Sequence, residues 1–186
     1  MAGDSLTIQN GATVTFDFVN EHEFTIAGYG SLIFGAEYNQ STQQNEAAPV
    51  RVVAVGEKGT LVGITDPNDR YANAGIWTYA KDLKKGEPDI YLKNINVDLE
   101  NYYYGFRADG GSITLRSGGF VEMRNSESTG LYSQNDGLID LELDSLKIDN
   151  AKMGIRSMNN AGSKVSSDSL TILNVECGIL GSHDGW

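Results

Sequence analysis

Cysteine, proline and histidine are scarce in this chain of 186 residues, which contains one Cys, three Pro and two His. A single Cys excludes a disulfide-built scaffold and a zinc site made from several cysteines. Basic residues are also few: 14 Lys and Arg stand against 25 Asp and Glu, for a formal net charge of −11. So acidic a chain lacks the positive surface that nucleic acid or anionic lipid requires, and we expect no nucleic-acid partner. No apolar run approaches the roughly 18 residues of a transmembrane helix.

Glycine, in contrast, is abundant, with 22 residues, well above the average usage of about 7%. Five glycines precede an apolar residue and recur at a nearly constant spacing: Gly75, Gly105, Gly130, Gly154 and Gly178. The four intervals are 30, 25, 24 and 24 residues. A period of this length is typical of solenoid proteins, whose units are stable only when they stack on one another.

An asparagine lies four or five residues before each of the last four glycines: Asn101, Asn125, Asn150 and Asn174. The residues before each Asn alternate between apolar and polar, and this period of two is typical of strands. Because a side-chain amide both donates and accepts hydrogen bonds, we expect these asparagines to form a ladder at an inward-facing turn. The glycine after each one is expected to relieve a tight bend.

These patterns predict an all-β fold, a parallel β-helix with coils of about 24 residues that lie roughly 4.8 Å apart. An antiparallel sandwich also contains Gly, Asn and alternating runs, and it is the alternative. Four Asn and Gly matches in register favour the β-helix. A leucine-rich repeat fits poorly, because its Leu-rich consensus is missing.

The whole chain, residues 1–186, is predicted to be a single β-helix fragment. Residues 1–30 are expected to form an N-terminal cap and the first coils, and residues 75–180 the regular coils. The polar, Gln- and Asn-rich stretch 36–49 is predicted to be a protruding loop. The repeat restarts at Cys177-Gly178 and then stops, which favours a piece of a longer protein.

The repeat units also resemble a known class of proteins. Asn-x-x-x-Gly-Ile, preceded by Leu-x-Ile, is similar to right-handed parallel β-helices of the pectin-lyase-like class. The opening residues, Asp4 to Ile8 and Gly11 to Phe16, resemble the start of bacterial autotransporter (type V secretion) passenger domains.

This resemblance implies a secreted or cell-surface virulence protein, held at the outer membrane by a C-terminal barrel outside this chain. It implies adhesion, self-association or display, with a host or bacterial surface protein or glycan, or another copy, as partner. The near absence of Cys agrees with export through an oxidising compartment. We therefore expect no enzyme, no cofactor and no metal, and a pure structural stalk is an alternative role.

Two groups of side chains are candidates for ligand binding. Tyr102, Tyr103 and Tyr104 are consecutive and are predicted to form an exposed aromatic patch, of the kind that binds sugars or proteins. Arg107 and Arg156 each lie two residues after a repeat glycine, so they should align two coils apart and make a basic spot. The 36–49 loop is a further candidate, because rigid scaffolds often carry function on loops.

A polysaccharide-active enzyme, a lyase or hydrolase on acidic glycan, is the main rival. Such chemistry needs clustered carboxylates, and the candidates are Asp98, Glu100, Asp140, Glu142, Asp144 and Asp149. Asp140 and Glu142 alternate with apolar residues and are therefore expected to face outward. The short polygalacturonase motifs are absent, and no catalytic residue is assigned.

Calcium binding and cysteine chemistry are two further alternatives. Asp66, Asn68 and Asp69, or Asp136 with Asp140, could gather hard oxygen ligands, although such sequences are also ordinary turns. His22 has no partner in a motif and is interpreted as part of a surface turn. Cys177 is interpreted as a small buried side chain.

Overall fold

The computed structural model describes residues 88–181 and, before them, the segments 6–8, 13–17, 23–27, 32–35, 37–39, 44–46, 50–55, 59–64 and 74–79. All of the secondary structure in these residues is β-strand or turn. The early strands are β1 (Leu6–Ile8), β2 (Thr13–Asp17), β3 (Glu23–Ala27), β4 (Leu32–Gly35), β5 (Glu37–Asn39), β6 (Gln44–Glu46), β7 (Val50–Val55) and β8 (Gly59–Ile64). The later strands are β9 (Ala74–Tyr79), β10 (Pro88–Lys93), β11 (Ile95–Glu100), β12 (Tyr104–Asp109), β13 (Ser112–Gln134), β14 (Leu138–Ser157) and β15 (Gly162–Gly181).

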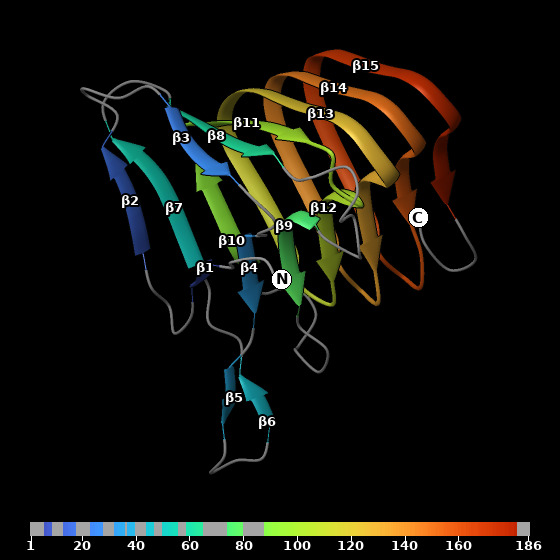
Figure 1. Ribbon diagram of the computed structural model, residues 1–186. Coiled ribbons are helices and arrows are strands. Elements are labelled where there is room, and N and C mark those ends of the chain that lie inside the picture. The colour runs from blue at the N-terminus through green and yellow to red at the C-terminus, as the bar shows by residue number, and fades with distance from the viewer. Residues whose placement is uncertain are drawn as a thin grey trace.

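The strands form a parallel β-solenoid with three faces, and Figure 1 shows the coils stacked side by side. On the first face, β2, β7 and β10 pair in turn and lead to the beginning of β13. On the second face, β3, β8 and β11 lead to the middle of β13. On the third face, β1, β4, β9 and β12 lead to its end. Each of β13, β14 and β15 runs around all three faces, so residues 88–181 make four consecutive coils.

The register confirms the predicted coil length. Every pair between β14 and β15, from Leu138 with Gly162 to Ser157 with Gly181, is offset by 24 residues. The predicted all-β fold of parallel coils is therefore confirmed. Its right-handed sense stays a prediction.

The core lies inside the coils, where equivalent apolar residues stack on one another. Leu92, Leu115 and Leu141 are in register on the first face, and all three are fully buried. Each such side chain contributes about 1.5–3 kcal/mol relative to an exposed one. Because successive residues of a strand point to opposite sides, the alternating sequence pattern becomes an apolar interior and a polar exterior.

The predicted asparagine ladder is present, but it is not inside the solenoid. Asn101, Asn125, Asn150 and Asn174 occupy equivalent corners between the second and third faces. All four have left-handed φ angles of 51–65°, a conformation that Asn tolerates better than most residues. The expected inward orientation is wrong, because Asn150 and Asn174 are exposed. The corner conformation explains the choice of residue.

The ladder of amide bonds is also incomplete. Asn150 Nδ2 donates to Asn125 Oδ1 at 2.8 Å, whereas Asn174 Nδ2 donates to Asp149 Oδ1 at 2.7 Å. A second ladder, which the repeat pattern did not reveal, lies at the end of the third face. There Asn159 Nδ2 donates to Asn135 Oδ1 at 3.1 Å.

The repeat glycines also have a different role from the predicted one. They lie within strands, and among the described glycines only Gly110 has a left-handed φ. A Cβ added to Gly130 would lie 2.7 Å from Ile148 Cδ1 and 2.9 Å from the carbonyl oxygen of Gly154. The expectation that these glycines relieve bends is therefore wrong. They leave room for an inward side chain and for the next coil.

The stretch 36–49 contains β5 and β6, which pair antiparallel as a separate small sheet. In Figure 1 this pair lies away from the stacked coils. The first three strands, in the region predicted to contain the cap and first coils, pair with β4, β7 and β8 of the stack. In the residues that the structure describes, no helix is long and apolar enough to cross a membrane.

Candidate functional site

Four side chains line up along the outside of the third face, one on each of four successive coils. The strand register places Trp77 beside Arg107, Arg107 beside Tyr132, and Tyr132 beside Arg156. Each follows a residue that is buried in the core, such as Phe106 before Arg107, so the alternation turns it outward. We call Trp77, Arg107, Tyr132 and Arg156 the third-face column.

The column alternates cations with aromatic rings. The Arg107 guanidinium carbon lies 4.5 Å from the centre of the Trp77 ring, and the Arg156 guanidinium carbon lies 5.7 Å from that of Tyr132. Tyr104 stacks on Tyr132, with ring centres 4.8 Å apart and planes inclined by 10°. These are distances at which a ring attracts a cation and at which rings stack favourably. The rings therefore hold the two guanidinium groups in place.

The two arginines differ in their polar partners. Arg107 Nη2 donates to Asp109 Oδ2 at 3.0 Å, and Asp109 also accepts hydrogen bonds from Gln134 and Asn135. Arg156 has no hydrogen bond or ion pair in the described part of the chain, and its Nε is buried without an acceptor. Arg107 Nε is likewise buried without an acceptor, so the two arginines differ only in that Arg156 lacks a carboxylate partner in the described residues.

Burial also affects the tyrosines of this region. It raises the pKa of Tyr132, while the nearby Arg156 and Arg107 oppose that rise. Burial likewise raises the pKa of Tyr104, and Arg107 again acts in the opposite direction. Both phenols are therefore neutral at physiological pH and present hydroxyl groups rather than negative charges.

The structure separates the three predicted tyrosines. Tyr103 and Tyr104 are half-buried and meet edge to face, with ring centres 4.7 Å apart. Tyr102 is only 2% exposed, and burial raises its pKa to about 12. The expectation that Tyr102 belongs to an exposed patch is corrected, because its ring lies in the core.

Arg107 and Arg156 do lie two coils apart on one face, with Tyr132 between them. The sequence interpretation missed Tyr132 and did not align Trp77 with the two arginines. The signal was present, because every member of the column lies two residues after a repeat glycine. The same position in the last coil is Leu180.

Five of the acidic residues considered for catalysis lie within 4.0 Å of a cation on the other two faces: Asp98, Glu100, Asp140, Glu142 and Asp149. On the second face, Arg124 lies 2.8 Å from Asp98, and Lys147 lies 2.8 Å from Glu122. The hydrogen bond from Lys147 is the largest influence on Glu122 and holds the pKa of that carboxyl below its usual value. On the first face, Arg116 pairs with Asp140 and lies 3.6 Å from Glu142.

The remaining candidates are the residues considered for metal binding and the thiol of Cys177. In the described ranges no group of His, Cys, Asp and Glu residues is placed to hold a metal ion. Asp66, Asn68 and Asp69, like His22, lie outside the described residues. Cys177 is a half-buried free thiol whose Sγ lies 3.7 Å from the carbonyl oxygen of Ile179, so the expected burial is only partial.

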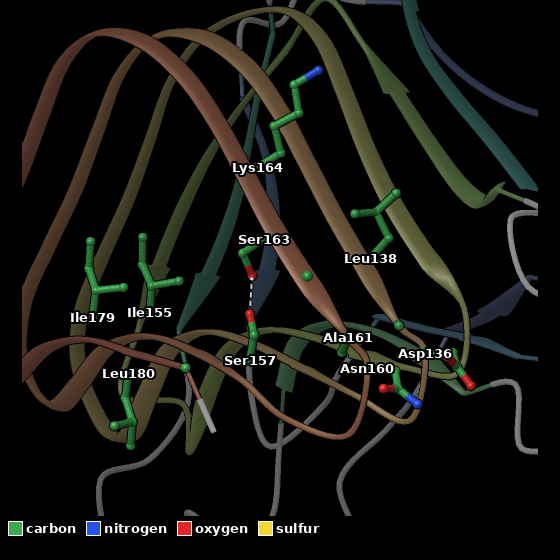
Figure 2. Close-up of a pocket in the computed structure, with 13 residues that line it drawn as sticks. Asp136, Leu138, Ile155, Ser157, Asn160, Ala161, Ser163, Lys164, Ile179 and Leu180 are labelled. Carbon is green, nitrogen blue, oxygen red and sulfur yellow. Dashed lines mark hydrogen bonds between the residues drawn. The ribbon is translucent and has the colours of Figure 1, made fainter. Parts of the chain in front are cut away.

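A hollow of about 510 Å³ lies at the end of the stack, between the turns before β14 and β15 and the end of β15. Figure 2 shows Ile155 and Ile179 side by side in it, with the hydrogen-bonded Ser157 and Ser163. The inward face of β15 is open here, since Ile179 is 63% exposed. The hollow is a continuation of the solenoid core.

Comparisons of the chain with protein-family models, curated proteins and solved structures found no match. The chain is classified as a parallel β-solenoid on its own structure. The resemblance to autotransporter passengers and pectin-lyase-like proteins stays a prediction.

Proposed function

We propose that this chain is a non-enzymatic segment of a secreted or cell-surface passenger that acts in adhesion, with the third-face column as its contact surface. The observation that carries the proposal is Arg156, a cation held against Tyr132 on a rigid sheet with no polar partner in the described residues. The terminal N–H groups of Arg156 are not buried, so they remain available to a bound partner that offers hydrogen-bond acceptors.

The scaffold supports this role. Parallel coils fix the side chains of the column at regular intervals, so a ligand meets a surface that is already ordered and loses little entropy on binding. Tyr103 and Tyr104 lie beside the column and enlarge the aromatic surface. Aromatic and arginine side chains are the residues that most often dominate the energy of an interface.

The test is binding of purified, fluorescently labelled protein to bacterial and animal cells, compared between wild type and Arg156→Gln. The control variant is Lys152→Gln, which removes one positive charge from an exposed position next to the Asn150 corner. We expect wild type and Lys152→Gln to bind alike and Arg156→Gln to bind several-fold more weakly. Thermal unfolding of each variant establishes that it is folded.

Three outcomes would contradict the proposal. Wild type that binds no cell type excludes adhesion, and concentration-dependent self-association in analytical ultracentrifugation would then favour contact between copies of this chain. Equal binding by Arg156→Gln and wild type would remove the column as the contact surface. Release of new chain ends from an acidic polysaccharide would replace the non-enzymatic role by the enzymatic alternative.

A further inference from the structure

We infer that the open edge of β15 binds the same edge of a second copy, so that two solenoids meet end to end in a two-fold dimer. This contact lies at the end of the stack and not on its outer faces, so it goes beyond the proposed function and does not depend on it. In the described residues β15, the last coil in Figure 1, pairs only with β14. Its other edge therefore presents a row of backbone N–H and C=O groups, which is a template for pairing with another chain.

The inward side chains of β15 form the apolar part of this end. Each is in register with a buried residue of β14: Val165, Leu170, Ile172, Val175 and Ile179. The end is open to solvent, because Leu170 is 47% exposed and Ile179 is 63% exposed. A partner that covered these side chains would give them the burial that their β14 equivalents already have, and burial of apolar surface is the main force that stabilises protein association.

Gly178 indicates that this edge has room for a close neighbour. At the equivalent Gly154, an added Cβ would lie 2.7 Å from Ile172 Cγ2, so glycine is needed there to admit a side chain of the next coil. A Cβ added to Gly178 would meet no atom within 4 Å. The edge of β15 therefore offers space for a partner's inward side chains at the position where Gly154 receives one.

The sequence of β15 is compatible with a copy of itself. Asp149 and Arg156 of β14 are followed in register by Leu173 and Leu180, which are 46% and 37% exposed. A two-fold contact places the same strand against itself, so charges at these positions would bring like charges close together across the contact. The inward positions of β15 are also uncharged, since its charged residues are all at exposed positions: Lys164, Asp168 and Glu176.

The opposite end of the solenoid is a poorer match for β15. In the described residues, the first face begins at β2 and the second at β3, whereas the third face has one strand more, because β1 lies beyond β4. That end is therefore uneven, and in a head-to-tail contact β15 would pair with β1 on the third face alone. Because β15 runs around all three faces, two copies of it can pair antiparallel around the coil. Two-fold dimers are also the commonest oligomers of soluble proteins.

A contact made by one coil predicts a weak dimer. β15 contributes 20 residues, at the low end of the roughly 20–30 residues per partner in a standard interface. We therefore expect the monomer to dominate at about 1 μM and the dimer at about 500 μM.

The experiment is sedimentation velocity of the 186-residue chain across this concentration range, with a reducing agent present so that Cys177 forms no disulfide. Hydrogen exchange then locates the contact. The backbone amides of β15 that do not pair with β14 should exchange more slowly in the concentrated sample than in the dilute one.

Variants of the edge complete the test. Leu170→Asp places a charge at an inward position and is expected to raise the dimer dissociation constant at least about tenfold. Gly178→Val fills the room for the partner's side chains, and it should have an effect of about the same size. The control Lys152→Gln makes the same change in net charge at an exposed position of β14, and it should change the constant by less than about twofold. Thermal unfolding of the dilute variants establishes that each is folded.

Four results would overturn the inference. A monomer at every concentration excludes the dimer, and species larger than a dimer exclude a closed two-fold contact. A dimer that neither Leu170→Asp nor Gly178→Val weakens uses another surface. Slow exchange of the outer β15 amides already in the dilute monomer would mean that another segment of this chain covers the edge. None of these results changes the expected dependence of cell binding on Arg156, so the adhesive role is tested separately.

Discussion

The coils formed by β14 and β15 have the same sequence pattern and the same register, yet they differ sharply in burial. Leu146 is 1% exposed and its partner Leu170 is 47% exposed, while Ile155 is 7% exposed and its partner Ile179 is 63% exposed. The difference arises because β14 pairs with a coil on each side and β15 pairs only with β14 in the described residues. A unit of this fold obtains its register from its own residues and its core from its neighbours.

The sharpest test of this comparison is truncation of equivalent core residues. Leu146→Ala is expected to cost about 2–5 kcal/mol of unfolding free energy, because it leaves a cavity between two packed coils. Leu170→Ala is expected to cost about 1 kcal/mol or less, since water already reaches that side chain. Urea denaturation of both variants measures the two losses. Equal losses would mean that another surface covers β15 in solution.

The repeat glycines provide a test in which even the sign of the effect should differ. A Cβ at Gly154 would lie 2.7 Å from Ile172 Cγ2 and against the carbonyl oxygen of Gly178, so Gly154→Ala is expected to cost about 1–3 kcal/mol. At Gly178 no atom lies within 4 Å of an added Cβ. Gly178→Ala should therefore be neutral or stabilise by about 0.5 kcal/mol, through reduced freedom of the unfolded chain. Thermal unfolding distinguishes a loss from a gain, and a loss at Gly178 would refute this explanation.

At the asparagine corners, we expect a substitution to cost the β14 coil and the β15 coil the same stability. Asn150 and Asn174 have φ angles of 60° and 51°, and this backbone strain is local and independent of neighbouring coils. Asn150→Ala and Asn174→Ala are each expected to cost about 1 kcal/mol, whereas Asn150→Gly should keep most of the stability because glycine adopts this φ readily. Denaturation of the three variants is the measurement. A large loss for Asn150→Gly would instead assign the role to the amide bond with Asn125.

The smallest expected effect concerns the ion pairs on the outer surface of the second face. Glu122 and Lys147 pair, whereas the equivalent position on β15 is Thr171, which carries no charge. Because the folded-state pKa of Glu122 is lowered, its contribution is present above the unfolded-state value of 4.5 and is lost as the pH falls through the folded-state pKa. Glu122→Gln should thus be slightly less stable than wild type at pH 7 and should match it in strong acid. Thermal unfolding across this range checks the prediction, and a gap that persists in acid would contradict it.

Much of the fold could be predicted from local patterns, because strand alternation and corner asparagines act within a few residues. The same regularity placed Arg107 and Arg156 on one face, two coils apart. It also contained Trp77 and Tyr132, each two residues after a repeat glycine, but the column could be recognised only once the coils were aligned across all faces.

The remaining errors concern quantities that depend on contacts between distant residues. The burial of Tyr102 is set by the packing around it, and the need for Gly130 is set by Ile148 and the next coil. The local sequence pattern reveals neither the residues that pack around Tyr102 nor those that lie next to Gly130.

The sequence by itself determined that this protein forms parallel coils of about 24 residues, since the period of its glycines, asparagines and apolar residues repeats in every regular unit. Only the tertiary structure decided that the asparagines face outward, that the glycines admit neighbouring side chains, and that Arg156 lies against Tyr132 without a polar partner in the described residues. The physical reason is that a repeat specifies which residues are equivalent, whereas burial, steric room and unused hydrogen bonds depend on what the adjacent coil places beside them.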